Sequence, residues 1–385
     1  MFSRRTEWNL TPNRLTLAHQ DALSSGKRII DLTTSNPTRA EIAYEESAIL
    51  KALGDRKALD YDPQPKGLRS AREAVAAYYA SAIDPESLIL TASTSEGYSF
   101  VFCLLCNPGD EILVPKPSYP LFDFLAELQD VSLIPYSLIY DHGWQIDFHS
   151  LENAITPKSR GIVLVHPNNP TGSYVGADER QQVNEVCHQH KLAMIVDEVF
   201  LDYAHDGEHK PSFAANEDAL TFTLSGISKI SALPQMKLAW IAVSGPSVDV
   251  APAVQRLEII ADTYLSLSAP VQLAAPVLLD QRKTIQPQLM SRIRANLAEL
   301  DRQLAMQKSC NRLVVQGGWY VVLRIPVTRS DEDFAIELLQ RSGVLVHPGH
   351  FYDFSSDGYL VLSLIAARGE FRNGVSAALQ FASSL

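Results

Sequence analysis

The sequence predicts an α/β fold with one large, mainly parallel sheet and a smaller α+β domain. Short apolar runs alternate with longer amphipathic segments from about residue 70 to residue 275, as in repeated β-α units. The apolar runs are rich in Ile, Val and Leu with little alternation, which is typical of strands covered on both faces. The chain has 385 residues, which is too long for one small core.

The expected elements divide the chain into two parts. Strands of the large domain are expected at residues 88–91, 111–114, 162–165, 194–197 and 240–243. A long helical pattern through 297–300, the segment Gly-Gly-Trp-Tyr-Val-Val-Leu at 317–323, a helix near 332–341 and a strand near 359–364 follow. The segment 29–32 should pack with these later elements. We therefore expect a large domain at 45–275 and a discontinuous small domain from 1–44 and 276–385.

Composition excludes several classes of function. The chain is 46% hydrophobic and 20% charged, and its net charge of −11 is spread along the sequence without a Lys/Arg run. This pattern disfavours nucleic acid as a partner. The N-terminus lacks the apolar run of a signal peptide, and no later stretch is long enough to span a bilayer. We expect a cytoplasmic protein with no membrane partner.

The four cysteines do not suggest a disulfide framework. Cys103 and Cys106 form a C-x-x-C pair in an almost wholly apolar helical stretch, and no second pair completes a metal site. We expect both to be buried core cysteines, and we expect no metal in this protein.

The segment Ala-Ser-Thr-Ser-Glu-Gly at 92–97 lies between a strand and an apolar helix. Ser93, Thr94 and Ser95 place hydroxyls and free backbone N–H groups at a helix N-terminus, which suits a phosphate. The alternative is an ordinary N-cap formed by Ser93 or Ser95, with Glu96 in the first turn. Alone, the motif favours the cap; with Lys229 downstream, it favours the phosphate site.

Lys229 follows a strand that ends in small polar residues, so its amine is expected beside a cleft at a strand's carboxyl end. A lysine held there can form a Schiff base. Desolvation and a cationic neighbour, for which Lys237 is a candidate, would lower its pKa and make it a nucleophile and base. The alternative is a solvated surface lysine.

Two more polar residues follow buried strands. Asp197 ends the strand at 193–196, where its carboxylate can keep a pyridine nitrogen protonated. The alternatives are a capping aspartate or an acid pair with Glu198. Asn169 lies after the strand at 162–165, in a loop with two prolines and a glycine. One β-α unit fits between Asn169 and Asp197 and another before Lys229, so consecutive strand ends would bring all three to one crevice.

Further motifs extend along nearly the whole chain. They are DLTTSNP at 31–37, Tyr61 with Gly-Leu-Arg at 67–69, NPGDE at 107–111, PSYP at 117–120, GGWY at 317–320 and VHPG at 346–349. With these motifs the sequence resembles the class I/II aminotransferases, fold-type I pyridoxal-phosphate enzymes related to aspartate and aromatic aminotransferases. The resemblance implies a mainly parallel seven-stranded sheet between helices in the large domain.

The resemblance implies a role for each residue around the cofactor ring. Lys229 would hold pyridoxal phosphate as a Schiff base and later move the proton, and Asp197 would pair with the pyridinium nitrogen. Asn169 would hydrogen-bond the ring hydroxyl. Tyr119 and Val199 would pack on the two faces of the ring.

The resemblance also implies how phosphate and substrate are held. The residues at the phosphate end would be Ser93, Thr94, Ser95, Ser228 and Lys237. Tyr61 would reach the phosphate of the neighbouring subunit, which implies a homodimer with shared active sites. The substrates would be an amino acid and a 2-oxo acid, bound with the help of Asn36, Asn169 and Arg368.

Three positions near the cofactor depart from the family pattern. At Phe200 the family usually has a tyrosine whose hydroxyl tunes the ring oxygen. At Gly226 a serine is common, so the side-chain part of the phosphate cradle is weakened. At Lys237 an arginine is common, so a point charge replaces a bidentate fork.

The fourth departure concerns the substrate. Val361 stands where the family usually has the arginine that binds the α-carboxylate, and a valine cannot bind a carboxylate. Either another cation, such as Arg368, His347 or His350, takes over, or the substrate lacks this contact.

The leading hypothesis is an aminotransferase. Its first alternative is a pyridoxal-phosphate-dependent lyase or other chemistry at the α-carbon, since the cofactor site alone does not select which bond breaks. A non-catalytic ligand sensor is the second alternative. It is disfavoured because residues 1–44 are too few and too weakly basic for a DNA-binding domain.

Overall fold

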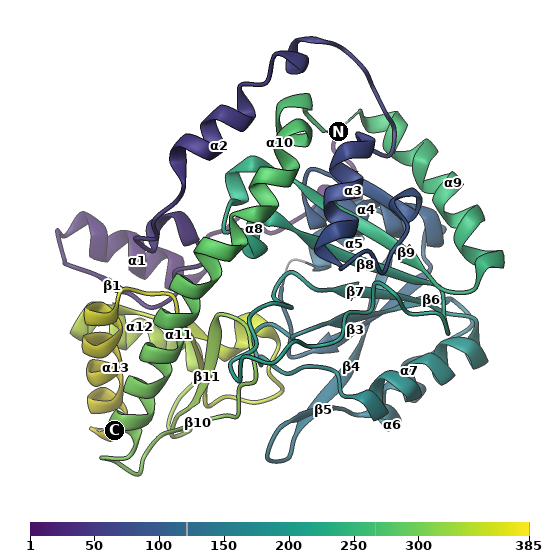
Figure 1. The fold of residues 1–385 in the computed structure, drawn as a ribbon. Coiled ribbons are helices and arrows are strands. Elements are labelled where there is room, and N and C mark those ends of the chain that lie inside the picture. Colours follow the sequence, from purple (N-terminus) through teal and green to yellow (C-terminus); the bar gives the residue numbers. More distant parts are fainter. Residues whose placement is uncertain (121, 266, 385) are drawn as a thin grey trace.

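The larger sheet holds eight strands in the part of the chain that the computed structural model describes, residues 1–120, 122–265 and 267–384 (Figure 1). In spatial order they are β2 (Leu88–Thr91), β9 (Ala239–Ser244), β8 (Thr221–Gly226), β7 (Ala193–Asp197), β6 (Ser159–Val165), β3 (Glu111–Lys116), β4 (Ser132–Tyr140) and β5 (Trp144–Ile146). All but β9 and β5 run in the same direction. The expected seven strands were one too few, because the short edge strand β5 pairs with the end of β4.

Helices cover both faces of this sheet (Figure 1). Successive strand residues point to opposite faces: Ile195 packs with α4, α5 and α9, whereas Met194 and Val196 pack with α6 and α7. Both faces are therefore apolar, as the strand composition predicted. The helices are α2 (Glu46–Leu53), α3 (Arg69–Tyr78), α4 (Thr94–Leu105), α5 (Phe122–Leu128), α6 (Phe148–Ala154), α7 (Ala177–His190), α8 (Ile227–Ile230), α9 (Ser247–Tyr264) and α10 (Ala269–Asp280).

A second, antiparallel sheet is built mainly from the C-terminal part of the chain. Its strands are β10 (Asn311–Arg312), β11 (Tyr320–Arg324), β14 (Tyr359–Ser363) and β13 (His347–Pro348), in that order. The surrounding helices are α1 (Arg14–Ser24), α11 (Arg282–Leu304), α12 (Asp331–Ser342) and α13 (Arg368–Ser383). A parallel pair of short strands, β1 (Ile30–Asp31) and β12 (Val344–Leu345), lies beside it.

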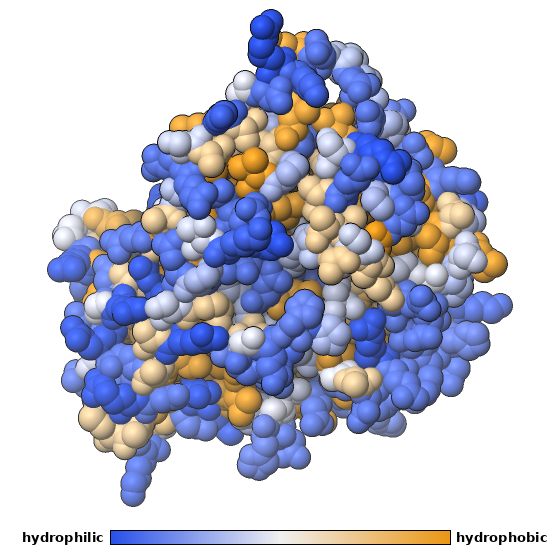
Figure 2. Space-filling view, in the orientation of Figure 1, coloured by the Kyte–Doolittle hydropathy of each residue, from blue (hydrophilic) through white to orange (hydrophobic). Residues whose placement is uncertain are grey.

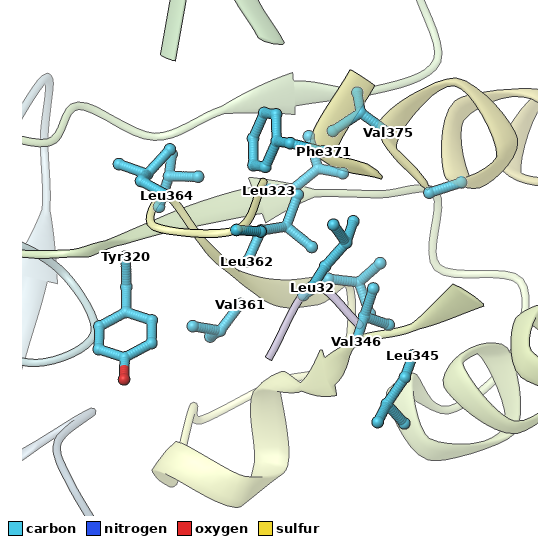
Figure 3. Packing of buried hydrophobic residues seen from close by; sticks show 14 of the residues in the cluster. Leu32, Tyr320, Leu323, Leu345, Val346, Val361, Leu362, Leu364, Phe371 and Val375 are labelled. Atoms are coloured by element: carbon cyan, nitrogen blue, oxygen red, sulfur yellow. The ribbon is translucent and has the colours of Figure 1, made fainter. Parts of the chain in front are cut away.

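The N-terminal segment shares a hydrophobic core with this second sheet. Leu32 is fully buried and packs in one cluster with Val346, Leu362 and Phe371 (Figure 3). The expected packing of residues 29–32 with later elements is thus confirmed, while the domain boundaries at 44 and 275 stay a prediction. Burial of such side chains stabilises the fold by roughly 1.5–3 kcal/mol each.

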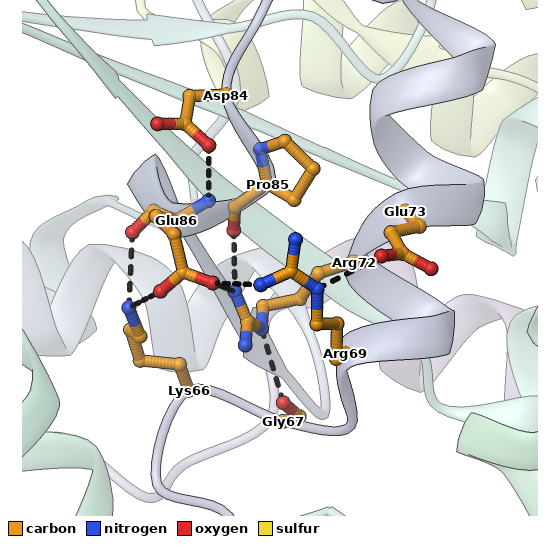
Figure 4. Close-up of polar contacts among 8 residues, drawn as sticks. All are labelled: Lys66, Gly67, Arg69, Arg72, Glu73, Asp84, Pro85 and Glu86. Atoms are coloured by element: carbon orange, nitrogen blue, oxygen red, sulfur yellow. Dashed lines mark hydrogen bonds and ion pairs between the residues drawn. The ribbon is translucent and has the colours of Figure 1, made fainter.

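A buried arginine anchors the segment that leads into β2 (Figure 4). Arg72 donates to the carbonyl oxygens of Gly67 at 3.1 Å and Pro85 at 2.6 Å, and to the Glu86 carboxylate at 3.0 Å. Hydrogen bonds from Lys66 and Arg72 lower the pKa of Glu86 to about 2. This network fixes the start of β2, the strand that Ser93 follows.

Two further observations bear on the expectations from sequence. None of the helices in the described ranges is both long and apolar enough to cross a membrane. Cys103 on α4 is exposed, whereas Cys106, just after this helix, is partly buried against the core, so the expectation that both are buried was wrong for Cys103. Although α4 is almost wholly apolar in sequence, one side of this helix still faces solvent.

Candidate active site

The predicted site residues follow strands that share one direction. Asn169 comes after β6, Asp197 ends β7 and Lys229 lies just after β8, while Ser93 follows β2 and Tyr119 follows β3. Carboxyl ends of co-directional strands meet at one edge of a sheet, which is where ligands of open α/β sheets bind. The sheet therefore gathers these residues along one edge.

The amine of Lys229 faces the rings of Trp319 and Phe200, at 5.0 and 5.8 Å from the ring centres. Burial lowers the pKa of Lys229 to about 8, and the negative charge of Asp197 opposes that shift. Lys237 is exposed, and burial rather than a cationic neighbour is the cause of the lowered pKa. Desolvation alone brings the lysine close to a useful proton affinity.

Two donors orient the carboxylate of Asp197. The backbone N–H of Val199 donates to its Oδ1 at 3.1 Å, and the hydroxyl of Tyr98 donates to its Oδ2 at 3.2 Å. Burial raises the pKa of Asp197 to about 6, while these two hydrogen bonds and Lys229 oppose the rise. The neighbouring Glu198 points elsewhere, to Ser212 and Phe213, so the two acids do not act as a pair.

Asn168 and Asn169 have different surroundings. Asn168 is buried and donates to Pro117 O at 3.1 Å and to Thr171 Oγ1 at 2.9 Å, so it holds the loop together. The buried side-chain oxygen of Asn169 finds no hydrogen-bond partner among the described residues. A buried polar atom without a partner costs free energy, which a ligand can relieve.

The segment at 93–96 forms a helix cap. Ser93 Oγ accepts the N–H of Glu96 at 3.1 Å, and the Glu96 carboxylate accepts the N–H of Ala92 at 2.7 Å. The cap alternative is therefore present for Ser93. Thr94 and Ser95 begin α4, where the first backbone N–H groups have no intrahelical acceptor and can bind an anion.

Gly226 has a steric reason to be glycine. A Cβ there would lie 2.8 Å from Ala239 Cβ and 2.9 Å from the carbonyl oxygen of Leu238, across the pair β8–β9. Ser228 follows in α8 and is partly buried, whereas Lys237 has a left-handed backbone with φ of 53°. The serine that the resemblance suggests at 226 cannot fit without movement of the backbone.

Tyr119 and Tyr61 are the exposed members of the predicted set. Tyr119 is 44% exposed in the loop after β3, and burial of its hydroxyl end raises its pKa. Tyr61 is 83% exposed and shares a hollow of about 100 Å³ with Leu265 and Leu267. Their roles at the cofactor stay predictions.

The second sheet turns an uncharged face toward the lysine. Val361 pairs with Val322 and His347, so these side chains lie in one row, and Tyr320 is on the same face as Val361 (Figure 3). The Tyr320 ring is 6.2 Å from Phe200, which links this face to Lys229. Burial lowers the pKa of His347, which disfavours a positive charge beside Val361.

A hollow of about 560 Å³ opens between residues 31–41 and 365–370, and the backbone oxygen of Thr34 in its lining accepts a hydrogen bond from Ser363 Oγ of β14 at 2.6 Å. Asn36, from the predicted set, lines it together with Arg39, which sequence reasoning missed. Arg39 forms no ion pair in the described part of the chain, although Asp31, Glu41 and Glu370 line the same hollow. Arg368 is exposed and donates to Ser291 Oγ at 3.1 Å on α11.

This site defines a class of protein. A lysine with a pKa near neutrality, an oriented aspartate, an unpaired asparagine oxygen and a helix N-terminus gather at one edge of an α/β sheet. Such a set suits an enzyme that binds a phosphorylated carbonyl cofactor through lysine.

Comparisons with known proteins identify the family. The family model for aminotransferase class I and II matches residues 27–367. Glutamate-pyruvate aminotransferase AlaA of Haemophilus influenzae is 26% identical over 369 residues, covering 90% of this chain and 89% of that protein.

Solved structures show the same fold. An alanine aminotransferase from Pyrococcus furiosus matches with a TM-score of 0.90 and 21% identity, and each chain is covered completely. A double mutant of Thermus thermophilus aspartate aminotransferase matches with a TM-score of 0.85 and 21% identity over 99% of each chain. The chain thus belongs to the class I and II aminotransferase family, and it is a pyridoxal-phosphate-dependent aminotransferase.

The residues present fit this cofactor. The unpaired oxygen of Asn169 can accept a hydrogen bond from a ring hydroxyl, and the start of α4 can receive the phosphate. The carboxylate of Asp197, held by Tyr98 and the Val199 N–H, would be the partner for a protonated ring nitrogen. Sequence reasoning missed Tyr98, because nothing in its apolar helix signals a contact with an aspartate so distant in the chain.

Proposed function

We propose that this enzyme moves an amino group from an amino acid to a 2-oxo acid, with Lys229 as the covalent cofactor residue and the proton carrier. The supporting observation is the amine of Lys229, whose pKa of about 8 lies close to working pH. Pyridoxal phosphate supplies the electron sink that makes the substrate's α-hydrogen acidic. Asp197 holds the ring nitrogen, and Tyr98 and the Val199 N–H keep its carboxylate in place.

The remaining cofactor contacts belong to the same proposal. Asn169 binds the ring hydroxyl, and Tyr119 and Val199 pack on the ring faces. The phosphate is held by Ser93, Thr94, Ser95, Ser228 and Lys237. For Thr94 and Ser95 the support is the free helix N-terminus, whereas the Ser93 hydroxyl already caps the helix.

The experiment is an absorption spectrum of purified protein beside Lys229→Ala, while amino acids are added one at a time. Glutamate and alanine come first, because glutamate and pyruvate appear in the name of the Haemophilus relative. We expect a cofactor band that depends on Lys229 and converts to the pyridoxamine form with one class of amino acid. Ammonia release without conversion would favour the lyase, an alternative that the matched family does not favour.

For the substrate carboxylate we propose Arg39 rather than Arg368. Arg39 shares its hollow with Asn36, and the hollow is large enough for an amino acid. Its guanidinium forms no ion pair with the described residues, so its donors are available for a bidentate carboxylate contact. Arg368 instead donates to Ser291.

We also propose a homodimer with shared active sites. Large apolar side chains are exposed on α2, at the end of α9, directly after α9, and in the segment between α2 and α3. They are Leu50, Leu59, Tyr61, Tyr264 and Leu265. Figure 2 shows hydrophobic surface over the upper part of the molecule, where α9 and α10 lie. A second copy would cover such a surface. Size-exclusion chromatography with light scattering measures the mass of the protein in solution. The mass of a monomer at micromolar concentration would contradict the proposed dimer.

A cytoplasmic location belongs to the same proposal. Its support is that all four cysteines are free thiols, which suits a reducing compartment. Fractionation of the producing cells, with the enzyme followed by antibody, tests it.

A further inference from the structure

Two aromatic rings are the close neighbours of the Lys229 amine. Its nitrogen lies 5.0 Å from the ring centre of Trp319 and 5.8 Å from that of Phe200. Within the described residues, no hydrogen bond or ion pair holds this nitrogen. Distances below about 6 Å allow a cation to interact with the face of an aromatic ring, and indole is the strongest partner.

Trp319 reaches the lysine from the other sheet. It is fully buried and directly precedes β11. Two glycines make the approach possible: Gly318 has a φ of +81°, and a Cβ on Gly317 would lie 2.7 Å from the Tyr174 ring and 2.9 Å from Tyr203 O. The sequence Gly-Gly-Trp therefore lets the chain pass close to the loop after β7 and places the indole beside Lys229.

Two other aromatic residues fix the orientation of the indole. Phe200 and Tyr203 each contact it edge-on, with ring centres 5.2 Å away and planes at 67° and 82°. The Tyr203 hydroxyl also donates to the backbone oxygen of Lys229 at 2.6 Å. One tyrosine thus holds both the lysine backbone and the ring that faces its amine.

We propose that Trp319 is a positioning residue for Lys229, whose indole face binds the protonated amine and holds it at the reaction centre whenever the amine is not bonded to the cofactor. The inference rests on the proposed role of Lys229. An aromatic face favours the charged amine over the neutral one, whereas burial favours the neutral amine. Trp319 therefore raises the proton affinity of Lys229 against the effect of burial.

The experiment starts from full-length protein from which the cofactor has been removed. The rate at which this protein binds added pyridoxal phosphate is measured at a series of pH values. The neutral amine adds to the aldehyde carbon, a carbon–nitrogen bond forms and water leaves. The capture rate therefore rises as Lys229 loses its proton. Trp319→Phe and Trp319→Leu are compared with wild type. Trp240→Leu is the matched control, because Trp240 is equally buried but packs against Tyr78 and Tyr79.

In Trp319→Leu we expect the midpoint of this profile to move to lower pH by roughly 0.5–1 unit, with a smaller shift in Trp319→Phe. Trp240→Leu should leave the midpoint in place. An unchanged or raised midpoint in a folded Trp319→Leu protein overturns the inference, since the indole would then only fill space. If Trp319→Leu does not fold, the midpoint of Trp319→Phe is used instead, and an unchanged or raised midpoint in that variant overturns the inference. Equal capture by wild type and Lys229→Ala would instead sink the proposed function.

Discussion

Replacing Gly226 by serine tests whether steric crowding explains the glycine. The resemblance to aminotransferases suggests a serine at this position, so the change would add a hydroxyl to the proposed phosphate cradle if it fitted. The added Cβ would lie 2.8 Å from Ala239 Cβ, 2.9 Å from Leu238 O and 3.0 Å from Ala239 Cα. Gly226 pairs with Ala239 in the register of β8 and β9, so the obstacle is mostly backbone, which cannot rotate away.

We expect Gly226→Ser to lower the free energy of unfolding by about 2 kcal/mol, as overpacking substitutions do. Cofactor binding should weaken as well, because Lys229 lies one helical turn beyond the displaced strand end. Urea denaturation followed by circular dichroism measures the first effect, and titration with pyridoxal phosphate measures the second. Gly143→Ser is the control, since its Cβ would meet nothing within 4 Å. An unchanged urea midpoint with tighter cofactor binding would refute the steric explanation.

Three further tests, with five substitutions in all, concern the site and its support. Asn168→Ala should lower the free energy of unfolding by about 2–3 kcal/mol because it breaks buried hydrogen bonds, whereas Asn169→Ala should leave the urea midpoint in place and weaken cofactor binding in titration. Arg39→Gln should raise KM for the amino acid by roughly 10-fold or more with little change in kcat, while Arg368→Gln changes KM less than about twofold in the same assay. Glu86→Gln should destabilise the protein at neutral pH but not near pH 2, as measured by urea denaturation across pH.

The sign of the Glu86 effect follows from its pKa, which folding lowers from 4.5 to about 2. The carboxylate stabilises the folded protein above pH 4.5, and this contribution is lost as the pH falls toward 2. If the free energy of unfolding of wild type and Glu86→Gln differed by the same amount at every pH down to 2, the expected role of the Glu86 carboxylate would be contradicted. Equal effects of the two asparagine variants, or a larger KM change from Arg368→Gln than from Arg39→Gln, would contradict the other two expectations.

The sequence was most informative where strands are buried on both faces. The strand expected at 88–91 matches β2, and the strand expected at 194–197 lies within β7. The strand β4 was not expected, because most of its residues are exposed or half-exposed and Pro135 interrupts it. A strand at the side of the sheet lacks the continuous apolar run on which these predictions depend.

The site was predictable where a polar residue directly follows such a strand, as Asp197 does. Tyr98 and Trp319 could not be assigned in this way, because their contacts depend on how helices and sheets pack. Nor does sequence alone separate Asn168 from Asn169, since the two have the same side chain. Only the hydrogen bonds show that Asn168 holds the loop, whereas the side-chain oxygen of Asn169 has no partner among the described residues.

The segment Gly317–Trp319 brings an indole from one sheet to Lys229 beside the other, and this contact has a consequence for maturation of the enzyme. Trp319 belongs to the core of the antiparallel sheet, whereas Lys229 follows a strand of the larger sheet. A chain in which only the larger sheet has formed would lack Trp319 over this amine. The amine would then lose burial, which is the main cause of its lowered pKa, and this loss would outweigh the loss of the opposing effect of the indole. Such a chain would capture the cofactor slowly at neutral pH. Loading with pyridoxal phosphate therefore marks those molecules in which both halves have been assembled.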